Sequence, residues 1–353
     1  MDAGVVTSSA PVSVSVTPPR HASRAVAGRL DGLRGVLPAA CVIVIALVLG
    51  ARSSPYFLDP GALLLHTGRY VEIGLLALAL TIVIINGDID LSVASNVAVS
   101  AAVLAIAHRA GAPIALSCAL AVLTGLVLGL VNGVLVAVVG LPSLVATLGT
   151  LAAYRGISEI LLGSDYIGDF PDSFAEVDRV MLFGTSAEWP IPLPLVVLLL
   201  TAAAFGFLLQ RTNFGLRCLL TGSNSAATRF SGISIWRVRV QAFALSGMMA
   251  GAAAVLIASR LSSVSAGIAT GMELPAITVV VLGGTSIFGG RGSILGTVVA
   301  LFAVMAVREA LAINNVQGET QDAVIGLILI ASILVPRTVT RLRSRLVRGR
   351  VHT

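Results

Sequence analysis

VEIGLLALALTIVI–INGDIDLSVASN–VAVSAAVLAIA, residues 71–107, consists of two apolar runs joined by a short polar break. The break places Asp88 and Asp90 where hydrocarbon side chains are expected on either side. A carboxylate at the centre of a membrane helix costs roughly 2.5–3.5 kcal/mol, so both acids need water, a helix N-terminus or a partner. We expect a tight turn between two spans, with Asp90 as the N-cap of the helix that begins LSVASN.

The polar break also allows a second interpretation. Ser92 and Asn96 continue its hydrophilic character into the following helix. Polar side chains inside a membrane often line the path of a solute. The stretch is therefore a candidate lining of a translocation pathway as well as a helix cap, and the two roles are compatible.

Composition shows what surrounds this stretch. Of the 353 residues, 56% are hydrophobic and 11% charged, and the mean hydropathy is +0.98. A soluble domain carries about 25% charged residues, so the sequence predicts an all-α polytopic membrane protein. We expect about ten transmembrane helices, some of them broken or short, at 36–51, 70–86, 91–107, 112–139, 143–162, 190–209, 238–259, 273–289, 293–312 and 321–336.

The arginines predict how these spans are oriented. With ten spans and both termini in the cytoplasm, most arginines fall on the cytoplasmic side, in the N-terminal tail, the loop 210–237 and the C-terminal tail. We therefore divide the chain into a disordered cytoplasmic tail (1–35), a transmembrane domain (36–336) with an acidic outer loop (163–189), and a basic cytoplasmic tail (337–353).

Several function classes are excluded or disfavoured by residue type. All 23 basic residues are arginine, so the chain holds no lysine-containing phosphate loop and forms no lysine Schiff base. The three cysteines are isolated, the four histidines lie in tails or loops, and no spacing indicates a metal site. The basic residues flank apolar runs without aromatic interleaving, which argues against nucleic-acid binding.

The loop 210–237 is the one long connection on the predicted cytoplasmic side. Within it, GSNSAATRFSGI at 222–233 predicts a short helix with Ser223 or Asn224 as N-cap and Gly232 just after its end. Such a helix either lies on anionic lipid headgroups or docks into a soluble partner, and the residues alone favour neither.

Two further segments contain residues that are unusual in a membrane helix, and their presence needs a physical explanation. TVVVLGGTSIFGGRGSILGT, 278–297, is rich in glycine, which weakens a helix by about 1 kcal/mol per position. Close packing or an unwound segment would explain Gly283, Gly284, Gly289 and Gly290. In the span 143–162, Arg155 and Glu159 stand four residues apart, which predicts an intramembrane ion pair.

Together these segments resemble the permease subunits of ATP-driven sugar importers, of the ribose, xylose and arabinose type. NGDIDLSVAS resembles the family element GGIDLSVGS, and NGVLVAVVGLPSLVATLGTLAAYRG at 132–156 resembles its N-G-x-L-V…T-L-G-T…R-G block. TGSNSAATRFSGI resembles its G-x-N-x-x-A-A-x-x-S-G-I loop, and VVLGGTSIFGGRGSILGT its glycine-rich block. The resemblance covers roughly 70–336 and includes features of the rhamnose and autoinducer-2 branch. Two residues depart from the family pattern: Asp88 and Ala94 stand where glycines are usual.

The resemblance implies a function and a set of partners. Such a chain moves a monosaccharide across the bacterial plasma membrane together with two ATPase subunits, a second permease chain (identical or different) and an extracytoplasmic sugar-binding protein. ATP and Mg²⁺ would be bound by the ATPase and no cofactor by this chain. The ATPase-coupling residues would be Gly222, Asn224, Ala226, Ala227, Arg229, Ser231 and Gly232. The solute would pass uncharged polar groups, and the pathway candidates are Asp88, Asp90, Ser92, Asn96, Asn132 and Thr147.

An ion-coupled secondary transporter of a small polar solute is the alternative. It would need an intramembrane acid that faces the pathway, a role for which Asp88 or Asp90 are candidates. An intramembrane enzyme is disfavoured because no histidine lies at span depth.

Overall fold

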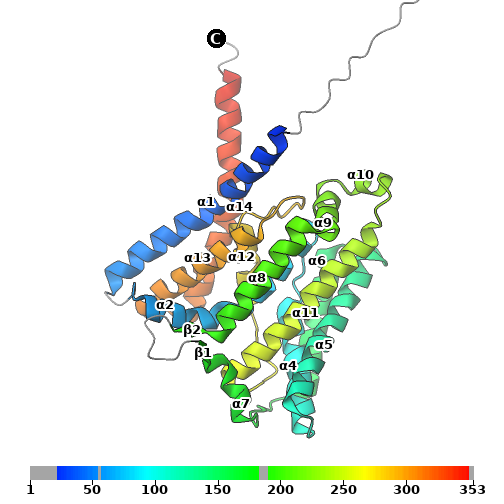
Figure 1. The fold of residues 1–353 in the computed structure, drawn as a ribbon, viewed down its shortest axis with the longest axis vertical. Helices are drawn as coiled ribbons and strands as arrows, with labels where there is room; N and C mark the ends of the chain where they lie inside the picture. The colour runs from blue at the N-terminus through cyan, green and yellow to red at the C-terminus, as the bar shows by residue number, and fades with distance from the viewer. Residues whose placement is uncertain (1–21, 55–56, 183–189, 350–353) are drawn as a thin grey trace, which may run out of the picture.

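The structure, a computed structural model, describes residues 22–54, 57–182 and 190–349, with side chains described between 37 and 334. Helices dominate these ranges, and the single sheet among them pairs two short strands (Figure 1). The helices are α1 (Ala22–Ser53), α2 (Pro60–Thr67), η1 (Gly68–Tyr70), α3 (Val71–Ile85), α4 (Val93–Arg109), α5 (Ile114–Ala137), α6 (Ser143–Leu162), α7 (Asp172–Ala175), η2 (Val177–Arg179), α8 (Leu193–Arg211), α9 (Asn213–Ser223), α10 (Ser225–Phe230), α11 (Ile235–Leu261), α12 (Glu273–Leu282), α13 (Ile294–Ile313) and α14 (Gly318–Gly349). The strands are β1 (Met181–Leu182) and β2 (Ile191–Pro192), which pair antiparallel.

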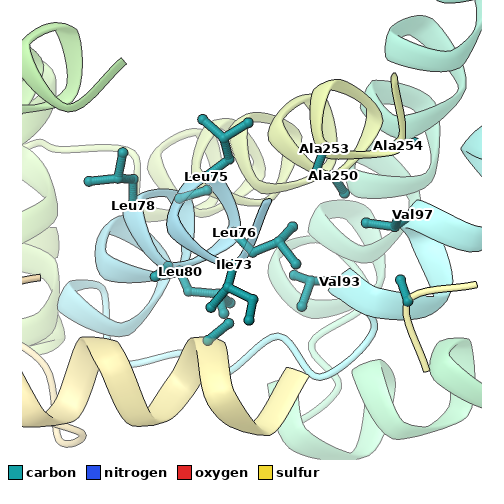
Figure 2. Packing of buried hydrophobic residues seen from close by; sticks show 14 of the residues in the cluster. Ile73, Leu75, Leu76, Leu78, Leu80, Val93, Val97, Ala250, Ala253 and Ala254 are labelled. Carbon is teal, nitrogen blue, oxygen red and sulfur yellow. The ribbon is translucent and has the colours of Figure 1, made fainter. Parts of the chain in front are cut away.

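Helix α3 is the centre of the fold. Every residue from Val71 to Ile85 is buried, as expected of a helix that is apolar on all sides. Figure 2 shows its leucines pointing outward on several sides, with Leu76 directed toward Val93 of α4, and the alanines of α11, such as Ala250, lying near Val97. Because α3 ends directly at the polar break, that break is held in the interior of the helix bundle.

Helices α5 and α11 pack closely through glycine. A Cβ on Gly125 would lie 2.3 Å from the carbonyl oxygen of Gly247, and one on Gly129 would lie 2.4 Å from that of Phe243. Glycines four residues apart let two membrane helices approach backbone to backbone. The spacing of Gly125, Gly129 and Gly133, together with that of Gly247 and Gly251, is the sequence signal for this interface.

The predicted spans correspond to helices of unequal length. Each of the ten predicted ranges overlaps a helix. Within the described residues, five helical stretches are long and apolar enough to cross a membrane: Pro60–Ile85, Ile114–Ala137, Leu193–Arg211, Ile235–Leu261 and Ile294–Ile313. Helix α12 is too short to cross: at about 1.5 Å per residue it is roughly 15 Å long, half the thickness of a bilayer core. The predicted span 273–289 is therefore wrong in its second half, since the helix ends at Leu282 and residues 283–293 form an irregular loop, here called the glycine loop.

The ends of the chain differ from expectation. Helix α1 begins at Ala22, so residues 22–35, predicted as disordered, are helical, and Val26, Leu30 and Leu33 recur at helical spacing there. Helix α14 likewise continues to Gly349 through most of the predicted basic tail. Residues 1–21 and 350–353 of the predicted tails lie outside the described residues. In Figure 1, α10 and the far end of α14 lie at one end of the molecule, and α7 with the strands lies at the other.

Candidate functional site

Helix α10 projects from the end of the bundle on a defined support (Figure 1). The Asn224 side chain accepts a hydrogen bond from the backbone N–H of Ala227 at 2.9 Å, which confirms Asn224 as the N-cap. The Thr228 hydroxyl, on the inner side of α10, donates to the carbonyl oxygens of Leu220 and Asn224, each at 2.8 Å. Gly232 follows the helix with a φ of +78°, as predicted. The remaining predicted coupling residues beyond the N-cap, Ala226, Ala227, Arg229 and Ser231, are exposed.

Backbone contacts tie the support of α10 to the core. Gly222, near the end of α9, lies against the end of α3, where a Cβ would be 1.8 Å from the carbonyl oxygen of Ile85. The same Cβ would lie 2.5 Å from the N–H nitrogen of Gly290, which donates to the Ile85 carbonyl at 2.8 Å. The end of α3, the end of α9 and the glycine loop therefore meet with no side chain between them. The junction therefore connects the support of α10 to the end of α3, directly before the polar break.

The four glycines singled out in the sequence have distinct local reasons. Gly289 and Gly290 have φ of +82° and +75° and pack on Gly222 and Ser223. Gly284 has a φ of +85° in the turn that leaves α12. A Cβ on Gly283 would lie 2.6 Å from the backbone of Gly296, where α12 packs on α13. Close approach and positive φ together account for the density of glycine.

Asp88 is paired with Arg239 in the second turn of α11. The Nε atom of Arg239 lies 3.1 Å from Oδ2 of Asp88, and the side chains are 30% and 5% exposed, respectively. Neither of these two atoms has a well-directed hydrogen bond in the structure, so the contact is an ion pair without the added directionality of a hydrogen bond. Since α11 follows α10 after a few residues, this pair is a second connection between α10 and the polar break.

Asp90 is fully enclosed and is held by hydroxyls. Its Oδ1 accepts from the backbone N–H of Ser92 at 3.0 Å and from the Ser92 hydroxyl at 2.7 Å, and its Oδ2 accepts from the Ser246 hydroxyl at 3.0 Å. The prediction of Asp90 as N-cap is wrong, because α4 begins at Val93 and its N-cap is Ser92. The carboxylate instead closes the turn before the helix and reaches across to α11.

The remaining pathway candidates extend this network. The Asn132 amide donates to the Ser92 hydroxyl at 2.7 Å, and the Asn96 amide donates to the Gly125 carbonyl at 3.2 Å. The Thr147 hydroxyl lies 3.2 Å from the Ile89 carbonyl and 2.8 Å from that of Ser143. The structure therefore places all six candidates at or beside the polar break, buried within a single chain. Asp88 pairs with Arg239, and the other five bond with each other, with nearby backbone or with Ser246. These hydrogen bonds favour a single conformation of the break.

Arg155 has partners other than the predicted one. Its Nη1 donates to the carbonyl oxygens of Ala266 and Ile268 at 2.8 and 3.1 Å. Among the described residues, the ion pairs do not include one between Arg155 and Glu159, and Glu159 is exposed. The predicted pair is wrong because the segment between α11 and α12 folds over α6 and offers carbonyl oxygens to the guanidinium.

A second charged cluster lies at the opposite end of the molecule. Arg260, in the last turn of α11, donates from Nε to the buried Glu72 carboxylate at 2.8 Å. Beside it is a cavity of about 240 Å³ lined in part by Arg69, Asp178 and Arg179. Burial raises the pKa of the Asp178 carboxyl, and the charges of Arg260 and Arg179 oppose that rise. This cluster belongs to the predicted outer side.

Comparison with known proteins places the chain in a family. A family model described as the permease component of a branched-chain amino acid transport system matches residues 66–333. The chain belongs to this permease family. Proteins named "Autoinducer 2 import system permease protein LsrD", from Yersinia pseudotuberculosis serotype O:3 (strain YPIII) and Yersinia pestis (strain Pestoides F), are each 34% identical to it over 310 residues, covering 86% of this chain and 91% of theirs. No solved structure matches it.

Family membership settles the class of protein. The chain is the multi-pass permease subunit of an ATP-binding-cassette importer in the bacterial inner membrane, and it works with ATP-hydrolysing and solute-binding partners. The residues that sequence reasoning missed are Arg239, Ser246 and Arg260, which hold the carboxylates of the break and of Glu72. The sequence signals only that these carboxylates need partners, because a charged side chain inside or beside a span needs one, and it does not name them.

Proposed function

We propose that this permease imports a monosaccharide or a sugar-like signal such as autoinducer 2, through ten spans with both termini in the cytoplasm. The relatives' names support the solute class, and the buried groups support a neutral solute. The solute would cross between this chain and a second permease copy or related chain, delivered by an extracytoplasmic binding protein. ATP and Mg²⁺ would be held by two ATPase subunits, and no cofactor by this chain.

The observation that carries the coupling role is helix α10. It is exposed, capped by Asn224 and joined through Gly222 to the core. Nucleotide-driven closure of the ATPases would push α10, and the junction would pass that movement to the break at Asp88 and Asp90. The pathway role of the six network residues follows only if this movement opens the network, since their side chains are buried in the present conformation.

The substitution Ala227→Glu tests the docking role. Ala227 is exposed, so the added carboxylate meets no neighbour within the chain and places a charge on the docking face. We expect membrane insertion and the melting temperature to be unchanged and co-purification with the ATPase subunit to be lost. Ala110→Glu, the same change at an exposed turn at the opposite end, is the matched control. Normal co-purification of Ala227→Glu would refute docking through α10.

Reconstitution separates the importer from the alternative, a secondary transporter. We expect liposomes that contain the assembled complex and the solute-binding protein to accumulate solute only with ATP. Liposomes that contain the permease alone should take up none under a proton or sodium gradient. Gradient-driven uptake without the ATPase would identify a secondary transporter.

A further inference from the structure

The tip of α10 carries an aromatic side chain that the chain itself leaves uncovered. Phe230, the last residue of α10, is 93% exposed, and no large apolar side chain in the described part of the chain is more exposed. It lies in the polar connection 210–237, on a helix at one end of the molecule (Figure 1). A partner that buries this ring would gain substantial stabilisation from it.

Helix α10, which carries Phe230, is held in place by hydrogen bonds within the chain. The Asn224 cap and the two hydrogen bonds of Thr228 fix the helix on α9, and Gly222 fixes the end of α9 on the core. A partner therefore meets a preformed surface, and little conformational entropy is lost on binding.

The charge around Phe230 indicates the chemistry of the partner. The segment 210–237 contains four arginines and no acidic residue. Arg229 is adjacent to Phe230 and exposed, and the Arg237 guanidinium lies 5.3 Å from the centre of the Trp236 ring. Arg291 of the glycine loop, which packs on the end of α9, is also exposed. A positively charged surface of this kind is complemented by carboxylates on a partner.

We propose, building on the function proposed above, that Phe230 is the anchor through which α10 binds the ATPase subunit. The ring enters an apolar pocket on that subunit, and Asp or Glu side chains on the pocket rim face the arginines of the loop. Buried aromatic anchors with a charged rim carry most of the energy of many interfaces. The small side chains of Ala226 and Ala227 allow the partner to approach α10 closely.

The shape of α10 argues for a protein pocket over a lipid surface. A helix that lies on headgroups needs a continuous apolar face several turns long. Helix α10 has six residues, of which Thr228 alone is buried, and the exposed ones are small, polar or charged except for Phe230. One ring on a short helix fits a single pocket.

The test measures binding of the permease in nanodiscs to its purified ATPase subunit. Phe230→Ala is expected to raise the Kd roughly 10- to 100-fold, and Phe230→Leu to stay within about threefold of the unmodified chain, because leucine still fills most of the pocket. Phe207→Ala removes an exposed ring from α8 on the membrane face and is expected to leave the Kd unchanged. Arg229→Glu is expected to weaken binding and to reduce the effect of added salt.

The outcomes separate the anchor from the docking role itself. If Ala227→Glu abolishes binding and Phe230→Ala does not weaken it, α10 docks but Phe230 is not the anchor. If neither variant weakens binding, docking through α10 fails, and the proposed coupling role of this helix fails with it. A polarity-sensitive dye on Phe230→Cys, with Cys41, Cys118 and Cys218 replaced by serine, should report a polar environment that becomes apolar when the ATPase subunit is added. An apolar signal in nanodiscs without that subunit would place residue 230 in lipid and overturn the proposal.

Discussion

Gly222→Val is expected to abolish ATP-driven uptake and to lower the free energy of unfolding by about 3 kcal/mol, at the upper end of the usual cost of overpacking. The first added carbon would lie 1.8 Å from the Ile85 carbonyl oxygen and 2.5 Å from the Gly290 nitrogen. Both are backbone atoms, so no side chain can rotate away, and the end of α9 has to move. Thermal unfolding in detergent and uptake into proteoliposomes measure the two effects.

The control for this prediction is Gly149→Val. Gly149 lies in α6, and a Cβ there would meet no heavy atom within 4 Å. The substitution is the same, and valine is slightly more favourable than glycine within a helix, so a loss of stability at Gly222 alone reports the clash. Gly222→Ala should change stability and uptake in the same direction, because its Cβ alone collides. A Gly222→Val variant that melts and transports like the Gly149→Val control would show that the junction between α9, α3 and the glycine loop is not closed in this way.

Local features of the chain were predictable because their causes are local. The helix α10 was found from its cap, since Asn224 accepts a hydrogen bond from a backbone N–H three residues on. The apolar runs predicted the positions of the helices for a similar reason, because each helix that crosses the membrane must itself be mostly apolar. Two local features still differ from the prediction. The short helix α9 lies where the sequence predicts a loop. Helix α12 ends at Leu282, before the glycines, although the apolar run predicts a longer helix.

Tertiary partners were not predictable from the sequence alone. Ser246 binds Asp90 from 156 residues away, and spacing along the chain contains no information about such a contact. Asp90 could therefore be recognised as a buried acid in need of partners, but those partners could not be named. Arg155 shows the opposite error, because a favourable spacing to Glu159 suggested a local pair while the backbone of a distant loop supplied the contacts.

Arg239→Gln is expected to destabilise the chain by about 2–3 kcal/mol, somewhat less than the cost of breaking a fully buried pair. The substitution leaves the Asp88 carboxylate, 5% exposed, without its cation, and an uncompensated buried charge is expensive. Asp88→Asn should cost about 1 kcal/mol or less, because Arg239 is 30% exposed and its guanidinium can reach water. The asymmetry between the two single variants is the signature of this pair, and thermal unfolding measures it.

The double substitution Asp88→Asn with Arg239→Gln completes the double-mutant cycle, because it combines the two single variants. It removes both charges of the pair. It should therefore be more stable than Arg239→Gln alone, as replacing a buried pair by neutral groups is often close to neutral. Arg217→Gln, at an exposed arginine of α9, controls for the loss of a positive charge on this surface. If Arg239→Gln were no more destabilising than Asp88→Asn or Arg217→Gln, the pair would contribute nothing, and the connection of α10 to the break would rest on the Gly222 junction alone.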